Sequence, residues 1–277
     1  MNFIELLKTF FIGIVQGITE WLPVSSTGHM ILFDEFVKLG GSDEFKEMFM
    51  VVIQLGSILA VAVLYFNKLN PFGKSKSDFE RKSTLLLWAK VLVGAVPAAL
   101  IGVLLDDWFD ANFYNFVVVA IALIVYGVLF IVIEGKKKDG VFKCESVDDI
   151  TFKDAFKIGC FQVLSLIPGT SRSGSTIIGG MLSNVSRVAS AEFSFFMAIP
   201  IMLGASGLKV LKFILSGSVM SFDEILILAI GIITAFAVSL VAIKFLMGFV
   251  KRHSFESFGI YRIALGAIIL LYFFVTK

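Results

Sequence analysis

The chain has 277 residues, of which 57% are hydrophobic, 17% are charged and 30 are phenylalanine. A soluble domain of this length has fewer apolar and more charged residues, so the composition indicates an integral membrane protein. The formal net charge of +2 is spread over short clusters between apolar runs, which excludes nucleic acid as the partner.

The first apolar segment, residues 3–33, is interrupted by the sequence GITEWLPVSSTGH at residues 17–29. A helix needs about 20 apolar residues to cross a bilayer core, and the Pro, Gly, Ser and Thr residues break this one in its middle. Two interpretations stay open for the segment. It is either a helical hairpin that enters and leaves by the outer face, or a single crossing.

Six uninterrupted spans are expected after it, and a second interrupted segment lies between the third and the fourth. The spans are residues 45–66, 85–105, 116–133, 193–215, 225–247 and 258–274. The second interrupted segment is residues 156–181. Pro97 and Pro200 lie within spans, where we expect kinks that the bundle tolerates.

The charges of the short loops predict the orientation of the spans. Loops 67–83, 135–154 and 251–253 are basic, whereas loop 106–115 carries three aspartates and no base. Basic loops mark the cytoplasmic side. By this count both ends of segment 156–181 lie inside, so this segment is expected to re-enter the membrane from the cytoplasm.

The two interrupted segments also resemble each other in sequence. The matched pairs, 146 positions apart, are Gly13 with Gly159, Gln16 with Gln162, and Thr19 with Ser165. The sequence PVSS at 23–26 matches PGTS at 168–171 after a one-residue slip. Small residues at helix contacts explain one such motif without any function, but two matched loops favour a functional site.

We therefore predict an all-α polytopic membrane protein with an inverted-topology repeat, six transmembrane helices and two re-entrant helical hairpins. The repeats are residues 1–134 and 155–277, joined by a cytoplasmic linker at 135–154. In such folds, hairpins from opposite faces bring their polar loops together near the midplane.

The second loop, PGTSRSGST at 168–176, has an arginine with apolar segments on either side. A guanidinium at membrane depth costs several kcal/mol unless it is paired or meets water, so Arg172 needs an anion. That anion is either Glu20 or the ligand. The planar guanidinium and the Gly- and Ser-rich start of a helix favour phosphate over carboxylate as the group that binds here.

The first loop supplies reactive groups. Glu20 follows Gln16 by one helical turn, and Ser26 and His29 come directly after the break. His29 alone is more typical of a cap or of a residue that faces lipid headgroups. With an acid and a hydroxyl close by, it favours chemistry that activates a nucleophile or a water.

Other polar residues carry weaker signals. Gln54 either supports the site or packs, and Asn184, Arg187 and Glu192 are expected at the interface. Cys144 and Cys160 lack the spacing of metal ligands and are expected to be inert thiols.

The motifs resemble the two signatures of the bacterial undecaprenyl-diphosphate phosphatases, the family associated with bacitracin resistance. They are QxxxE at 16–20 with PVSSTGH at 23–29, and PGTSRSGST at 168–176. The resemblance covers nearly the whole chain, including VIQLGS at 52–57 and EFSF at 192–195. The first motif position is Glu or Gln in the family, and here Gln16 leaves Glu20 as the one carboxylate of the pair.

The resemblance implies hydrolysis of undecaprenyl diphosphate to undecaprenyl phosphate and inorganic phosphate at the outer face of the bacterial plasma membrane, which recycles the carrier lipid for cell-wall synthesis. It implies that Ser26 attacks phosphorus, that Glu20 and His29 move protons, and that Arg172 holds the diphosphate. The other substrate-binding residues that it implies are Gln16, Ser25, Thr27, Gly169, Ser171, Ser173 and Thr176. A divalent cation, Mg²⁺ or Ca²⁺, is expected to bridge the diphosphate oxygens, with Glu20 as its protein ligand.

Several alternatives stay open. Ser26 either becomes phosphorylated or helps to orient an attacking water. The alternative function is a transporter or flippase for an anionic lipid phosphate, because inverted hairpins are a transporter device. The oligomeric state, for which a homodimer is one option, the metal and the preferred lipid chain length are not decided by the sequence.

Overall fold

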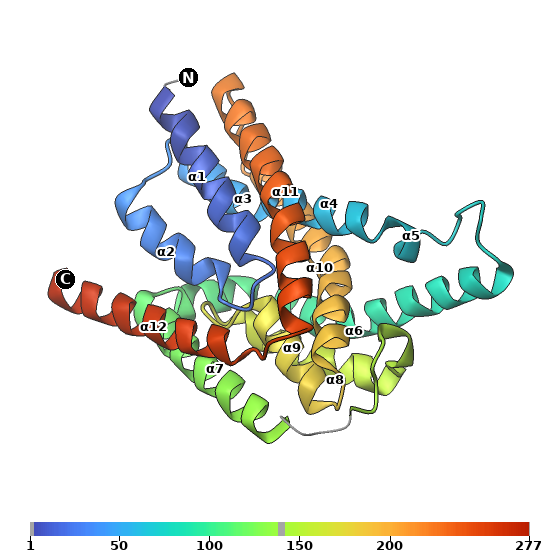
Figure 1. The fold of residues 1–277 in the computed structure, drawn as a ribbon. Coiled ribbons are helices and arrows are strands. Elements are labelled where there is room, and N and C mark those ends of the chain that lie inside the picture. Colours follow the sequence, from blue (N-terminus) through green and yellow to red (C-terminus); the bar gives the residue numbers. More distant parts are fainter. Residues whose placement is uncertain (1–2, 138–141, 277) are drawn as a thin grey trace.

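The computed structural model describes residues 3–137 and 142–276, which are mostly α-helical and form no strand (Figure 1). The first half contains α1 (Phe3–Thr19), α2 (Ser26–Phe36), α3 (Asp43–Val52), α4 (Gln54–Leu64), α5 (Phe66–Leu69), α6 (Asp78–Phe113) and α7 (Phe116–Lys137). The second half contains α8 (Phe152–Val163), α9 (Arg172–Leu182), α10 (Arg187–Leu215), α11 (Phe222–Val250) and α12 (Glu256–Thr276), with 3₁₀ turns η1 (Val147–Asp149) and η2 (Leu164–Leu166). The predicted all-α class is confirmed.

Six helical segments of the described chain are long and apolar enough to cross a membrane. They are Asp43–Leu64, Asp78–Leu105, Phe116–Lys136, Arg187–Leu215, Phe222–Val250 and Glu256–Thr276. They contain the six predicted spans except for residues 65 and 66 at the end of the first. The helix continues through Pro97 in α6 and Pro200 in α10. The first span instead divides at Ile53, between α3 and α4, which the sequence did not predict.

Both interrupted segments fold as pairs of helices whose outer ends meet. In the first hairpin, α1 and α2, the Gly40 N–H donates to Glu5 Oε2 (2.9 Å) and joins the exit to the entrance. In the second, α8 and α9, the Ser186 N–H after α9 donates to the Cys144 carbonyl before α8 (2.9 Å). A single crossing would separate such ends by the membrane thickness. The geometry therefore favours hairpins, while re-entry into a membrane stays a prediction.

The helix packing is reciprocal between the two halves. α1 lies along α11, α8 lies along α6, and α7 packs against α12. Gly127 of α7 and Gly259 of α12 face each other, and a Cβ built on either would meet the other's carbonyl oxygen at 2.7 Å. If α1 corresponds to α8, α6 to α11 and α7 to α12, each of these contacts is matched by an equivalent contact in the other half. A twofold relation between the halves produces this pattern. This supports the predicted repeats, whose boundaries stay a prediction.

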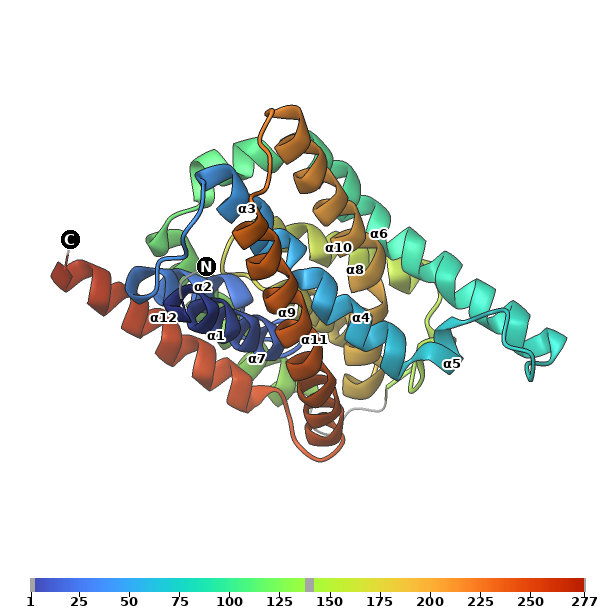
Figure 2. The same ribbon diagram turned by 90° about the horizontal axis from the view of Figure 1, so that it is seen from above.

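The connections between helices separate by charge. In Figure 2 the basic α5–α6 connection lies at the lower right and the basic α11–α12 connection at the bottom, whereas the uncharged α10–α11 connection lies at the top. This arrangement agrees with the orientation that the loop charges predict. Residues 138–141 of the predicted linker lie outside the described ranges.

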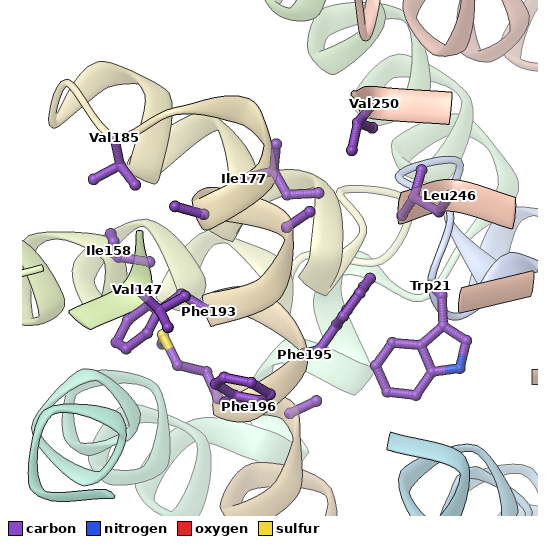
Figure 3. Packing of buried hydrophobic residues seen from close by; sticks show 14 of the residues in the cluster. Trp21, Val147, Ile158, Ile177, Val185, Phe193, Phe195, Phe196, Leu246 and Val250 are labelled. Atoms are coloured by element: carbon purple, nitrogen blue, oxygen red, sulfur yellow. The ribbon is translucent and has the colours of Figure 1, made fainter. Parts of the chain in front are cut away.

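The largest hydrophobic core lies around α9 and α10 and reaches the first loop. Figure 3 shows Phe193, Phe195 and Phe196 of α10 in this core, with the ring of Trp21 beside Phe195. Trp21 is fully buried, and its ring meets that of Phe195 edge-on with centroids 5.1 Å apart. Burial of a large apolar side chain stabilises a fold by about 1.5–3 kcal/mol, so Trp21 fixes the first loop against the second half of the chain.

Candidate active site

The loops that join α1 to α2 and α8 to α9 are built alike. Ser25 and Ser171 have φ angles of 71° and 72°, and each caps the helix that follows. The Ser25 hydroxyl accepts from the Gly28 N–H (3.3 Å), and the Ser171 hydroxyl from the Gly174 N–H (3.1 Å). Ser25 and Ser171 are 146 positions apart, the same spacing as between Gln16 and Gln162. The predicted match of Ser26 with Ser171, which required a one-residue slip, is therefore wrong.

This register places Ser26 and Arg172 at equivalent positions, the first residue of α2 and the first residue of α9. The two loops touch, because Ser173 Oγ donates to the Leu22 carbonyl (3.3 Å). A helix start presents free backbone N–H groups and the positive end of the helix dipole. Two such starts beside each other make a region suited to an anion.

Arg172 and Glu20 join the loops through an ion pair. Arg172 Nη2 donates to Glu20 Oε1 (2.9 Å), and Gln16 Nε2 donates to Glu20 Oε2 (2.8 Å). The other arm of the guanidinium, Nη1, donates to the carbonyl (2.8 Å) and the hydroxyl (3.2 Å) of Ser194. The guanidinium lies over the ring of Trp21, 5.5 Å from its centroid. Of the two partners that the sequence allowed for Arg172, Glu20 occupies the site here.

His29 is held by two oxygens. Its Nδ1 lies 2.8 Å from the Ser25 carbonyl and its Nε2 lies 2.7 Å from the Tyr261 hydroxyl. A carbonyl only accepts, so in the neutral ring Nδ1 carries the proton and Nε2 accepts from the tyrosine. The two rings are also stacked, with centroids 5.6 Å apart.

Ser26 is not bonded to either group expected to activate it. The Ser26 side chain is partly exposed, and its hydroxyl takes part in none of the hydrogen bonds found among the described residues. Both oxygens of Glu20 and both nitrogens of His29 are occupied by other partners. The serine is therefore free to meet a ligand, and its activation requires one of these bonds to be exchanged.

Arg262 of α12 is a site residue that the sequence reasoning missed. It is fully buried, and its guanidinium donates to the carbonyls of Pro23 (3.1 Å), Gly169 (2.9 Å) and Thr170 (2.9 Å). Its charge also lies over the ring of Tyr126, 5.6 Å from the centroid. Arg262 thus ties the first loop to the second. An arginine inside an apolar span is itself a sign of function, and this signal was present in the sequence.

The remaining predicted site residues lie on the same two loops. Ser171 and Ser173 share a hydroxyl contact (3.2 Å), Gly169 has a φ of 91°, and Thr176 donates to the Ser194 hydroxyl (2.7 Å). Thr27 follows Ser26 and is partly exposed. Ser194 and Tyr261 were not predicted, because only the fold brings α10 and α12 to the loops. Trp21 was not predicted either, although it lies on the first loop.

The polar residues with weaker signals lie apart from the loops. Arg187 forms a two-armed ion pair with buried Glu134 of α7, and Glu192 accepts from Lys68 (3.2 Å). These pairs join helices rather than bind at the site. Cys144 is buried, which raises the pKa of its thiol and makes it less reactive, as expected.

The loops do not form a complete metal site on their own. Within the described ranges, no group of three or more His, Cys, Asp or Glu side chains could hold a metal ion. Glu20 is the one acid on the loops, and each of its oxygens already accepts a hydrogen bond. The donor set therefore offers a cation one protein ligand, and most of its oxygen ligands would have to come from elsewhere.

Three buried N–H groups at the loops have no acceptor among the described residues. They are Nε1 of Trp21, Nε of Arg172 and Nε of Arg262. A buried donor left unpaired costs about 1–3 kcal/mol, so a water or a ligand oxygen is expected at each. These donors, the two helix starts and Arg172 together suit a ligand with many oxygens and a negative charge.

The chain is similar to known proteins over almost its whole length. The family model of the bacitracin resistance protein BacA matches residues 9–268. The chain is 55% identical to the undecaprenyl-diphosphatase of Enterococcus faecalis (strain ATCC 700802 / V583), with 98% of this chain and 99% of the relative covered. It is 56% identical to the undecaprenyl-diphosphatase of Acetivibrio thermocellus, with 99% and 100% covered. It is 53% identical to that of Limosilactobacillus fermentum, with 98% of each covered.

The matched range includes both loops and Arg262. The relatives are more than half identical over nearly the whole chain, so the comparison covers the site and almost all of the fold. The chain belongs to the family of the bacitracin resistance protein BacA.

Proposed function

We propose that the protein is a membrane phosphatase that hydrolyses undecaprenyl diphosphate to undecaprenyl phosphate and inorganic phosphate. The observation that carries this proposal is that Ser26 and Arg172 begin two helices whose preceding loops are in contact. The family and its undecaprenyl-diphosphatase members support the identity of the substrate. Recycling of the carrier lipid for peptidoglycan synthesis, and with it bacitracin resistance, is the role that follows.

In this proposal Arg172 exchanges partners when the substrate binds. Its guanidinium now engages Glu20, and the phosphate oxygens compete for the same N–H groups. Arginine and phosphate form strong bidentate hydrogen bonds, in which two N–H groups donate to two phosphate oxygens. The exchange places positive charge where negative charge develops on the phosphoryl group, and it releases one oxygen of Glu20.

Ser26 then acts as the nucleophile. Its oxygen attacks the terminal phosphorus, the bond from that phosphorus to the bridging oxygen breaks, and the lipid monophosphate leaves. Water cleaves the phosphoserine and yields inorganic phosphate. Glu20, once released, or His29, once Tyr261 turns away, takes the serine proton. If water attacks directly, the same groups orient the water and no phosphoserine forms.

Glu20 would be the protein ligand of a divalent cation, Mg²⁺ or Ca²⁺, and most of the remaining ligands would be oxygens from outside the protein. When bound, the cation would neutralise phosphate charge. The roles proposed for Arg172 and His29 rest on their hydrogen bonds, and the role proposed for Ser26 rests on its place at the start of α2.

We place this site at the outer face of the bacterial plasma membrane. The entrance of the first hairpin lies near the start of α11, because Glu224 of α11 accepts from the Ser42 N–H (3.4 Å) and Gly40 bonds to Glu5. The loop charges assign the start of α11 to the outer side. A homodimer stays a prediction.

The test is phosphate release by the purified protein in detergent with undecaprenyl diphosphate, with and without a chelator. We expect inorganic phosphate from the natural protein and none from Ser26→Ala. A protein that only transports the lipid releases none in either case. Rapid acid quench followed by mass spectrometry of the peptide containing Ser26 distinguishes a phosphoserine from direct water attack.

A further inference from the structure

An apolar groove runs away from the first loop between α2 and α12. Its volume is about 360 Å³, and His29 lies in its wall. The remaining lining residues are Val15, Leu32, Phe33, Phe36, Ile268 and Tyr272. Apart from His29 and the Tyr272 hydroxyl, these side chains are hydrocarbon. The groove therefore suits a branched apolar chain and not a polar headgroup.

The groove is continuous with the candidate active site through His29. The imidazole bonds to the Ser25 carbonyl and to Tyr261, and lies one helical turn after Ser26. A diphosphate held at the starts of α2 and α9 would therefore have its alkyl end next to His29. From there the apolar path follows α2 along its length, because the lining positions 29, 32, 33 and 36 share one helical face.

A second hollow, lined by residues of α7 and α12, is not connected to the candidate active site. It has a volume of about 690 Å³ and is lined by Phe116, Val117, Leu270, Leu271, Phe273 and Phe274. None of these residues belongs to the two loops. This hollow is larger and is also lined by hydrocarbon side chains, so size and an apolar lining alone do not identify the binding site.

We propose that the groove between α2 and α12 binds the first isoprene units of the lipid substrate and makes the site specific for a polyprenyl diphosphate. The proposal rests on the proposed function, because its occupant is that substrate's tail. Burial of hydrocarbon drives the tail into the groove. The groove also sets the direction of the substrate, with the terminal phosphate toward Arg172 and the alkyl end toward His29.

The first test uses a polyprenyl diphosphate that carries a photoreactive diazirine on its first isoprene unit. After illumination, mass spectrometry should find the label on α2 or on α12 near Ile268. Excess unlabelled undecaprenyl diphosphate should remove this label, and excess phospholipid should not. A label that responds to phospholipid instead means that ordinary bilayer lipid fills the groove, and this outcome overturns the proposal.

The second test fills each hollow with a large side chain. Ile268 and Leu271 are both exposed and lie one turn apart on α12, so Ile268→Trp and Leu271→Trp are a matched pair. We expect Ile268→Trp to raise the KM for undecaprenyl diphosphate about tenfold with kcat nearly unchanged, because lost ground-state binding acts on KM. Leu271→Trp should leave both constants as they are.

Equal constants for the two variants would overturn the groove assignment, and so would a KM effect confined to Leu271→Trp. These failures differ from failure of the proposed function. In that case the natural protein would release no phosphate from undecaprenyl diphosphate at all.

Discussion

The first hairpin (α1 and α2) and the second hairpin (α8 and α9) have similar backbone conformations but carry different side chains. Each has a serine at positive φ that caps its second helix, and each has a glycine, Gly13 or Gly159, where its first helix touches a neighbour. The equivalent side chains differ: Glu20 and Leu166, Ser26 and Arg172, His29 and Ser175. The shared backbone supplies two helix starts for an anion. The reactive groups come from the first hairpin and the positive charge comes from the second.

The largest effect is expected where equivalent positions both carry function. Ser26→Ala and Arg172→Lys should each lower phosphate release about a thousandfold or more. The first variant loses the proposed nucleophile, and an arginine in phosphoryl transfer contributes effects of this size. Lysine keeps the charge beside Glu20 but loses the planar fork. Assays at saturating lipid check this, with circular dichroism to confirm folding. Retention of a tenth of the activity by either folded variant contradicts the assignment.

The next comparison sets His29 against Ser175. His29→Gln should lower kcat about a hundredfold to ten-thousandfold, the usual range for a general acid or base. Ser175→Ala should change kcat less than twofold, because among the described residues its hydroxyl bonds only to the Arg172 carbonyl of its own helix (3.1 Å). Similar losses for the two variants in the same phosphate assay would mean that His29 is structural.

Arg262 and Phe130 offer a third comparison. They lie three residues after the facing glycines Gly259 and Gly127, so they are equivalent across the twofold relation. Arg262→Met leaves three carbonyls unpaired. It should lower kcat about a hundredfold, because small shifts of the loops cost this much. Phe130→Leu should cost roughly 1 kcal/mol of stability and leave kcat unchanged.

Thermal unfolding and kinetics measured together separate the two effects of Arg262. Arg262→Lys keeps a donor and should recover part of kcat. Equal losses of kcat at Phe130 and Arg262, in proportion to the loss of stability, would show that Arg262 has no positioning role.

The smallest effect is expected at the paired glutamines. Gln16 donates to Glu20, whereas Gln162 is fully buried and its amide has no partner among the described residues. Gln16→Leu should lower kcat about tenfold, because a hydrogen bond to a charged group contributes roughly 1.5–3 kcal/mol. Gln162→Leu should keep activity and leave the Tm equal or higher, since it removes a buried unpaired amide. A lower Tm would reveal a partner for Gln162.

The sequence by itself determined the membrane class, the six spans and the two interrupted segments. Hydrophobic length, Pro and Gly breaks and loop charge act locally, so they can be read along the chain. It also placed Glu20, Ser26, His29 and Arg172 on two loops. The register of these loops was misjudged by one residue at the serines, because the prolines were aligned and the caps were not.

Only the tertiary structure decided what meets these loops. The residues that contact the loops from other helices include Arg262, Tyr261, Ser194 and Phe195. The longest of these contacts, from Arg262 to the Pro23 carbonyl, spans 239 positions of sequence. It also decided that the oxygens of Glu20 and the ring nitrogens of His29 are bonded to partners other than Ser26. Local patterns fix which groups are available, whereas the hydrogen bonds they make depend on which surfaces the folded helices bury together.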